Sequence, residues 1–146
     1  MNPDFLDMLR AFSAERVEYL VVGAYALAAH GVPRATGDMD LWVRPSAENA
    51  ARVMAALRRF GAALGDLTPR DLATPGTSFQ IGVAPRRIDI LTSIDGVEFD
   101  AAWPSRVEID LSGTQVLVIG RSDFIRNKHA VGRPKDLADI DSLENG

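Results

Sequence analysis

The sequence predicts an α/β protein (an α+β mixed sheet) in which a mixed β-sheet is flanked by helices. Two observations predict it. Short apolar strands and amphipathic helices mix along the chain without a strict alternation, and two pairs of strands are joined by turns short enough for hairpins. A regular doubly wound sheet would need more crossover units. The 146 residues, 47% of them hydrophobic, suit one domain over 1–146 with a sizeable core.

Caps and apolar spacing define the elements in the first part of the chain. Asn2 can cap a first helix, and the proline at position 3 suits the first helical position. Ser46 can cap a longer helix that ends at Gly61, a residue typical of helix ends. The predicted elements are a helix over 3–15, a strand over 19–22, a helix over 24–29, a strand over 38–44 and a helix over 46–60.

The remainder of the chain is predicted to contain two hairpins and to end in helices. Turn residues separate each pair of apolar runs, and proline or serine begins each helix. The predicted elements are a short helix after 68–69, strands over 79–83 and 88–91, a helical turn over 99–103, strands over 107–111 and 116–119, and C-terminal helices within 122–145.

Composition excludes several classes of protein. The net charge of −4 argues against avid, non-specific binding of nucleic acid over the whole surface. No apolar run approaches the roughly 18 residues of a membrane span, and the acidic N-terminus lacks the basic start of a signal peptide. The chain has no cysteine, hence no disulfide and no thiolate metal site. A cytoplasmic protein is the simplest inference.

Two acidic residues alternate with apolar ones on the second predicted strand. Asp38 and Asp40 point to one face of that strand, and the residues between and after them point into a core. Asp89 stands among apolar residues in a later strand. Three acids on adjacent strands would form an oxygen-rich pocket suited to Mg²⁺. Without the ion, their mutual repulsion should raise at least one of the three pKa values.

An isolated aspartate near a strand end is most often a turn or cap residue, and an Asp-x-Asp pair alone is weak evidence. Here the pair Asp38 and Asp40 is accompanied by a glycine turn and a third acid. Gly23-Ala24 follows an apolar strand and precedes a small-residue helix, a turn whose backbone can approach an anion closely. The combination of turn, acid pair and third acid favours a functional site.

These residues resemble the nucleotidyltransferase superfamily, which has the polymerase-beta-like minimal fold. In that family an apolar strand, a Gly-Gly or Gly-Ser turn and a helix precede Asp-x-Asp or Asp-x-Glu, and a third acid follows on a later strand. The runs 22–40 and 128–139 are similar to a stand-alone bacterial branch, whose relatives include toxin–antitoxin components. Ala24 departs from the pattern, because a second glycine or a serine is usual there.

The resemblance implies a minimal nucleotidyltransferase fold and Mg²⁺-dependent transfer of a nucleoside monophosphate from an NTP such as ATP to an acceptor hydroxyl. Asp38 and Asp40 would bridge two Mg²⁺ ions, and Asp89 would complete the shell of one ion and help to deprotonate the hydroxyl. The backbone at Gly23 and Ala24 would lie near the phosphates.

Three further residues are candidates for nucleotide binding. Arg34 and Thr36 lie just before the acid pair and could contact phosphate, although a structural ion pair is the plainer role for Arg34. Lys128 could reach a phosphate from the penultimate helix, but a solvated lysine is the favoured expectation. Arg133 and Lys135 are expected to pair with Asp136 or Asp139 within the tail.

Several alternatives remain open at the level of sequence. The chain could be a catalytically decayed nucleotide- or partner-binding module of a toxin–antitoxin-like system, or a hydrolase that uses the same metal site. The acceptor could be RNA such as tRNA, a protein or a small molecule. A partner protein or a homo-oligomer could supply the acceptor-binding surface, because 146 residues leave little room for a second domain.

Overall fold

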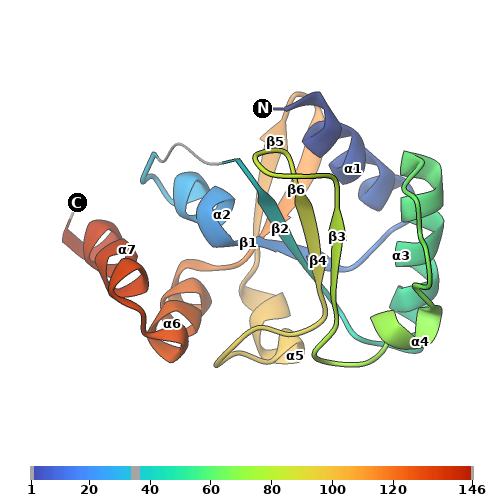
Figure 1. The fold of residues 1–146 in the computed structure, drawn as a ribbon. Helices are drawn as coiled ribbons and strands as arrows, with labels where there is room; N and C mark the ends of the chain where they lie inside the picture. The colour runs from blue at the N-terminus through green and yellow to red at the C-terminus, as the bar shows by residue number, and fades with distance from the viewer. Residues whose placement is uncertain (1, 34–36, 146) are drawn as a thin grey trace.

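A mixed sheet with the strand order β3-β4-β2-β1-β6-β5 forms the centre of this computed structural model, which describes residues 2–33 and 37–145 (Figure 1). The strands are β1 (Tyr19–Val22), β2 (Met39–Val43), β3 (Ser78–Ile81), β4 (Ile88–Leu91), β5 (Val107–Leu111) and β6 (Thr114–Val118). The helices are α1 (Pro3–Ala14), α2 (Gly23–Ala29), α3 (Ala47–Phe60), α4 (Pro69–Leu72), α5 (Phe99–Ala102), α6 (Arg121–Val131) and α7 (Pro134–Asn145), with a 3-10 turn at Trp103–Ser105.

Parallel and antiparallel pairing alternate across the middle of the sheet. Strand β2 is antiparallel to β1 and parallel to β4, and β1 is parallel to β6. The hairpins β3–β4 and β5–β6 complete the two edges. The predicted mixed sheet flanked by helices is therefore confirmed. No helix in the described part of the chain is long and apolar enough to cross a membrane.

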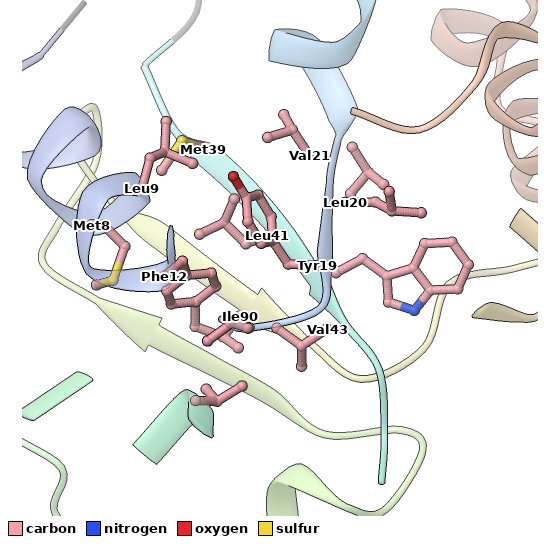
Figure 2. Close-up of a cluster of buried hydrophobic side chains, with 14 of the residues drawn as sticks. Met8, Leu9, Phe12, Tyr19, Leu20, Val21, Met39, Leu41, Val43 and Ile90 are labelled. Atoms are coloured by element: carbon pink, nitrogen blue, oxygen red, sulfur yellow. The ribbon is translucent and has the colours of Figure 1, made fainter. Parts of the chain in front are cut away.

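The main core lies between the sheet and helices α1 and α3, which cover one of its faces (Figure 1). Met39 and Leu41 of β2 are fully buried on this face, as their alternation with the acids predicts. Figure 2 shows them near Leu9 and Phe12 of α1. Each such side chain contributes about 1.5–3 kcal/mol through burial, which anchors β2 in the middle of the sheet.

Helices α2, α6 and α7 lie on the other side of the sheet (Figure 1). Trp42 has the same strand parity as Asp40, and it packs edge-on against Phe99 of α5 with ring centroids 5.0 Å apart. The acidic side of β2 therefore faces this second layer of helices, and residues of α6, of α7 and of the turn between them line one cavity with the aspartates.

Most predicted caps are confirmed. The Asn2 side chain accepts a hydrogen bond from the Asp4 amide at 2.8 Å, and the Ser46 side chain accepts one from the Asn49 amide at 3.2 Å. Gly61 ends α3 in the left-handed conformation, with φ +90°.

Several predicted boundaries are wrong by one or two residues. Strand β2 covers 39–43 rather than 38–44, so Asp38 lies just before it. Helix α6 begins at Arg121, one residue before the predicted start, because Gly120 and not Ser122 is its N-cap. Strand β3 covers 78–81 rather than 79–83, because Gly82 leaves the extended conformation with φ +79°. Strand β6 begins at Thr114, since the preceding turn is tighter than the sequence suggests.

Candidate active site

The register of the sheet brings two acids from different strands face to face. Asp40 is paired with Asp89 across the parallel β2–β4 ladder and with Val22 across the antiparallel β1–β2 ladder. Asp38 directly precedes β2. Because β1 ends at Val22, the first residue of α2, Gly23, lies directly beside Asp40.

Gly23 is shaped for a close approach. Its φ of +70° lies in the left-handed region that favours glycine. A Cβ atom there would clash with Oδ2 of Asp40 and would lie 3.3 Å from its Cγ. The absence of a side chain at Gly23 is therefore what gives the Asp40 carboxylate its place against the turn.

Arg87, which directly precedes β4, contacts both Asp38 and Asp89. Its Nε donates to Oδ1 of Asp89 at 2.9 Å, and its Nη2 donates to Oδ2 of the same carboxylate at 3.2 Å. The same Nη2 lies 3.4 Å from Oδ2 of Asp38. The backbone amide of Arg87 also donates to Oδ1 of Asp38 at 3.1 Å. One residue thus contacts both oxygens of two carboxylates.

Asp40 carries the electrostatic consequence of this crowding. Its pKa is raised from the ordinary 3.8 to about 7. Burial is the largest cause, followed by the negative charge of Asp89 and a hydrogen bond with it, and then by the charge of Asp38, while Arg87 opposes the rise. The raised pKa makes Asp40 easier to protonate near neutral pH than an ordinary aspartate, and its hydrogen bond with Asp89 agrees with the predicted repulsion.

A cavity of about 430 Å³ opens over these groups. Its walls are the β1–α2 turn, the ends of β2 and β4, the β3–β4 turn and the α6–α7 pair. The lining residues are Gly23, Ala24, Gly37, Asp38, Asp40, Ala84, Pro85, Arg87, Asp89, Lys128, Arg133, Lys135 and Asp139. The carboxylates of Asp38, Asp40 and Asp89 thus form the floor of the cavity. Lys128, Arg133 and Lys135 line the wall formed by α6 and α7.

The helical wall is held by a buried ion-pair network. Lys128 of α6 is only 8% exposed, and its Nζ lies 3.2 Å from both Asp136 and Asp139 of α7. Nε of Arg133 donates to Asp136 at 2.7 Å, which confirms the predicted pairing within the tail. Arg133 first, and Lys128 with it, lowers the pKa of Asp136 to about 2 although burial opposes the change.

The expectation of a solvated Lys128 is wrong. The turn at Gly132 folds α7 back along α6, so two aspartates of α7 enclose the ammonium group. Lys128 still lines the cavity, but it does so as part of the wall that its ion pairs hold in place.

The structure brings most of the predicted site residues together. Asp38, Asp40, Asp89, Gly23, Ala24 and Lys128 all line the one cavity. Arg34 and Thr36 lie outside the residues that the structure describes.

Sequence reasoning missed four lining residues: Arg87, Arg133, Lys135 and Asp139. A signal was present for Arg87, because a residue two positions before Asp89 points to the same face of an extended chain. The three tail residues carry no comparable signal, since their approach to the cavity depends on how α7 packs.

The chemistry of the floor fits a hard divalent cation. Three carboxylates share one cavity, and burial, together with the negative charges of Asp89 and Asp38, raises the pKa of Asp40 despite the opposing charge of Arg87. Among residues 2–33 and 37–145, however, no three His, Cys, Asp or Glu side chains are already arranged around a common point as metal ligands would be. The carboxylates of Asp38 and Asp89 are instead turned toward Arg87.

Comparisons with known proteins show similarity at the level of the fold. No family model matches the chain, and no curated protein matches it by sequence. TM1012 of Thermotoga maritima, a protein provisionally assigned as a nucleotidyltransferase, matches 99% of this chain and 95% of its own, at 15% identity and a TM-score of 0.60.

Two antibiotic-modifying enzymes match equally well. The lincosamide adenylyltransferase LnuA, bound to lincomycin, matches 99% of this chain and 97% of its own, at 13% identity and a TM-score of 0.63. ANT(2'')-Ia, in complex with adenylyl-2''-tobramycin, matches 98% and 88%, at 15% identity and a TM-score of 0.60. At these identities the likeness concerns the backbone, and the conclusion is that this chain has a nucleotidyltransferase fold.

Proposed function

We propose that this protein is a Mg²⁺-dependent nucleotidyltransferase, which moves a nucleoside monophosphate from an NTP to an acceptor hydroxyl. One observation carries the proposal: Asp38, Asp40 and Asp89 line a single cavity with the Gly23 turn on one side and basic residues on the other. Carboxylates suit the metal, and the turn and the basic wall suit a triphosphate. The cavity volume of about 430 Å³ is within the usual range for small-molecule sites.

Asp38, Asp40 and Asp89 are the residues that would hold Mg²⁺. Two bound ions would neutralise the triphosphate, stabilise the leaving pyrophosphate and lower the pKa of the acceptor hydroxyl. Asp40 must be ionised to act as a ligand, and its raised pKa favours the protonated form. We therefore expect metal binding by this protein to strengthen as the pH rises through 7.

The remaining residues bind and orient the substrates. Gly23 and Ala24 present backbone next to the acids, where phosphate oxygens can approach because Gly23 has no side chain. Arg133 and Lys135 are exposed on the opposite wall and suit contacts with the outer phosphates. Lys128 keeps that wall in place through its buried ion pairs.

In the reaction the acceptor oxygen forms a bond to the α-phosphorus while the bond from that phosphorus to the bridging oxygen of the β-phosphate breaks. Pyrophosphate leaves. Asp89 accepts the hydroxyl proton, since its carboxylate lines the cavity and lies opposite Asp40 across the β2–β4 ladder.

The relatives of similar fold suggest which acceptor to test first. LnuA is an adenylyltransferase for lincosamides, and ANT(2'')-Ia is seen with an adenylylated tobramycin. They support ATP as the donor and a hydroxyl of a small molecule as the acceptor. The net charge of −4 gives long RNA acceptors less support.

The test is a transfer assay with labelled NTPs and Mg²⁺ against hydroxyl-rich small molecules, tRNA and protein, with release of pyrophosphate as a second readout. We expect pyrophosphate release and label transfer by the wild type and their loss in Asp40→Asn. If the protein binds Mg-NTP in calorimetry but transfers nothing to any acceptor class, the decayed binding module replaces the enzyme. If the protein binds no Mg-NTP, the enzyme and the decayed binding module are both ruled out.

A further inference from the structure

We propose that Arg87 and the divalent cation are alternative occupants of the same carboxylates. In this proposal Arg87 neutralises the acids when no nucleotide is bound, and it transfers to the phosphates of the NTP when the metal–nucleotide complex enters. The inference deepens the proposed function and rests on it. It makes Arg87 a nucleotide-contacting residue and sets the order in which metal and nucleotide bind.

Arg87 occupies the carboxylate oxygens that a metal ion would need. Its guanidinium is within hydrogen-bond distance of both oxygens of Asp89 and pairs with Oδ2 of Asp38 at 3.4 Å. These contacts turn the two carboxylates toward the guanidinium. A divalent ion placed among the same oxygens would lie beside a fixed positive charge and be repelled by it.

The Arg87 guanidinium is able to leave the carboxylates of Asp38 and Asp89. The Arg87 side chain is 33% exposed, so it is in contact with the cavity and solvent rather than enclosed by the core. Its anchor point lies directly before β4, next to the β3–β4 turn that forms part of the cavity rim. Lys128 offers a contrast, because it is 8% exposed and enclosed by two aspartates.

The phosphates of the NTP offer Arg87 a partner equivalent to the Asp89 carboxylate. A guanidinium binds phosphate in the same bidentate way as it binds the Asp89 carboxylate. A triphosphate that enters with its metal ions therefore brings both the cation that takes over the acids and the anion that receives Arg87. Metal alone brings only the first, so wild-type protein should bind free metal weakly and metal with nucleotide much more tightly.

The test compares Arg87→Gln with Arg86→Gln, a matched control that removes the same charge from the exposed neighbouring residue. Binding of Mn²⁺ alone is measured by calorimetry, without nucleotide. We expect Arg87→Gln to bind Mn²⁺ about tenfold more tightly than wild type, because a repelling charge has left the ligands, and Arg86→Gln to match wild type. In the presence of Mn²⁺, a non-hydrolysable ATP analogue should bind Arg87→Gln more weakly than either of the others.

The outcomes separate this inference from the proposed function. If Arg87→Gln binds Mn²⁺ no more tightly than Arg86→Gln while all three proteins bind the metal–nucleotide complex, Arg87 is a static ion-pair residue and only this inference is overturned. If none of the three binds Mn²⁺ with or without nucleotide, the proposed function and the inference both fail. Arg87→Lys covers the case in which the glutamine variant does not fold. It retains the charge but loses the bidentate contact, so its affinity for Mn²⁺ alone should stay near that of wild type while the metal–nucleotide complex binds more weakly. An unchanged affinity for that complex would then overturn the inference.

Discussion

The carboxylate of Asp40 lies against Gly23 so closely that any side chain at position 23 would clash with its Oδ2 atom. Gly23 is the first residue of α2, and its φ is +70°. The two residues are 17 positions apart, yet the position of the Asp40 carboxylate restricts position 23 to glycine, and a side chain at position 23 would displace that carboxylate. The relationship couples the backbone of the predicted phosphate turn to the position of a predicted metal ligand.

Replacing Gly23 with alanine should lower the free energy of unfolding by about 2 kcal/mol, since it adds left-handed strain and the clash with Asp40. In an Asp40→Ala background the same replacement should cost about 1 kcal/mol, because only the strain remains. Urea denaturation of the four proteins measures the coupling. The bulkier Gly23→Val should lose stability and Mg-NTP affinity together.

Gly61→Ala is the control for the backbone term. Gly61 has φ +90°, and a Cβ there would meet nothing within 4 Å. It should therefore lose about 1 kcal/mol from strain alone. An equal loss at Gly23 in both backgrounds would show that Asp40 can move aside freely and that the contact has no energetic weight.

Asp40→Asn should stabilise the metal-free protein at alkaline pH. The folded-state pKa of Asp40 is about 7 against an ordinary 3.8, so the folded protein binds a proton more tightly and loses stability as the pH rises between these values. Asparagine carries no such proton. With screening by solvent taken into account, we expect a gain of about 2 kcal/mol, or about 5 °C in melting temperature, at pH 8.

The advantage of Asp40→Asn should shrink toward pH 4, where the wild-type carboxyl is protonated in the folded state. Melting curves in a chelator from pH 4 to 8 provide the measurement. A constant difference across this range would mean that the pKa of Asp40 is not raised. Nucleotide transfer should be lost at every pH, because the variant lacks a metal ligand.

Asp136 should stabilise the protein with the opposite dependence on pH. Its pKa is lowered to about 2, so its contribution is complete above about pH 4 and is lost as the pH falls toward 2. Asp136→Asn should cost on the order of 2 kcal/mol at pH 7 and progressively less below pH 4. Asp141→Asn, on the exposed side of the same helix, should stay within about 0.5 kcal/mol of wild type throughout.

Asn49 should be one of the most important polar residues for stability. It is 2% exposed, its Oδ1 accepts from the amide of Glu18 at 2.8 Å, and its Nδ2 donates to the carbonyls of Glu18 and Arg44 at 2.9 and 3.0 Å. Asn49→Ala leaves these groups unpaired and should cost about 3 kcal/mol in urea denaturation. Asn127→Ala, which removes one exposed bond to the Asp95 carbonyl, should cost less than about 1 kcal/mol.

Local patterns in the sequence were sufficient for the order of the main elements and for the three acids of the cavity. Strand parity placed Asp38 and Asp40 opposite the buried Met39, and cap chemistry located Asn2 and Ser46 at the starts of α1 and α3. Such features depend on residues within a few positions of one another, where the period of a strand or the unpaired amides of a helix decide the outcome.

Contacts across long separations were decided only by the tertiary structure. Arg87 meets Asp38 from 49 positions away because β2 and β4 are adjacent and in one register, and Lys128 is buried because α7 folds back along α6. The raised pKa of Asp40 depends on burial and on Asp89. The sequence by itself determined which acids share a strand face, whereas the distances that set their charge arise only when separate elements pack, because electrostatic energy depends on spatial separation and solvent exclusion.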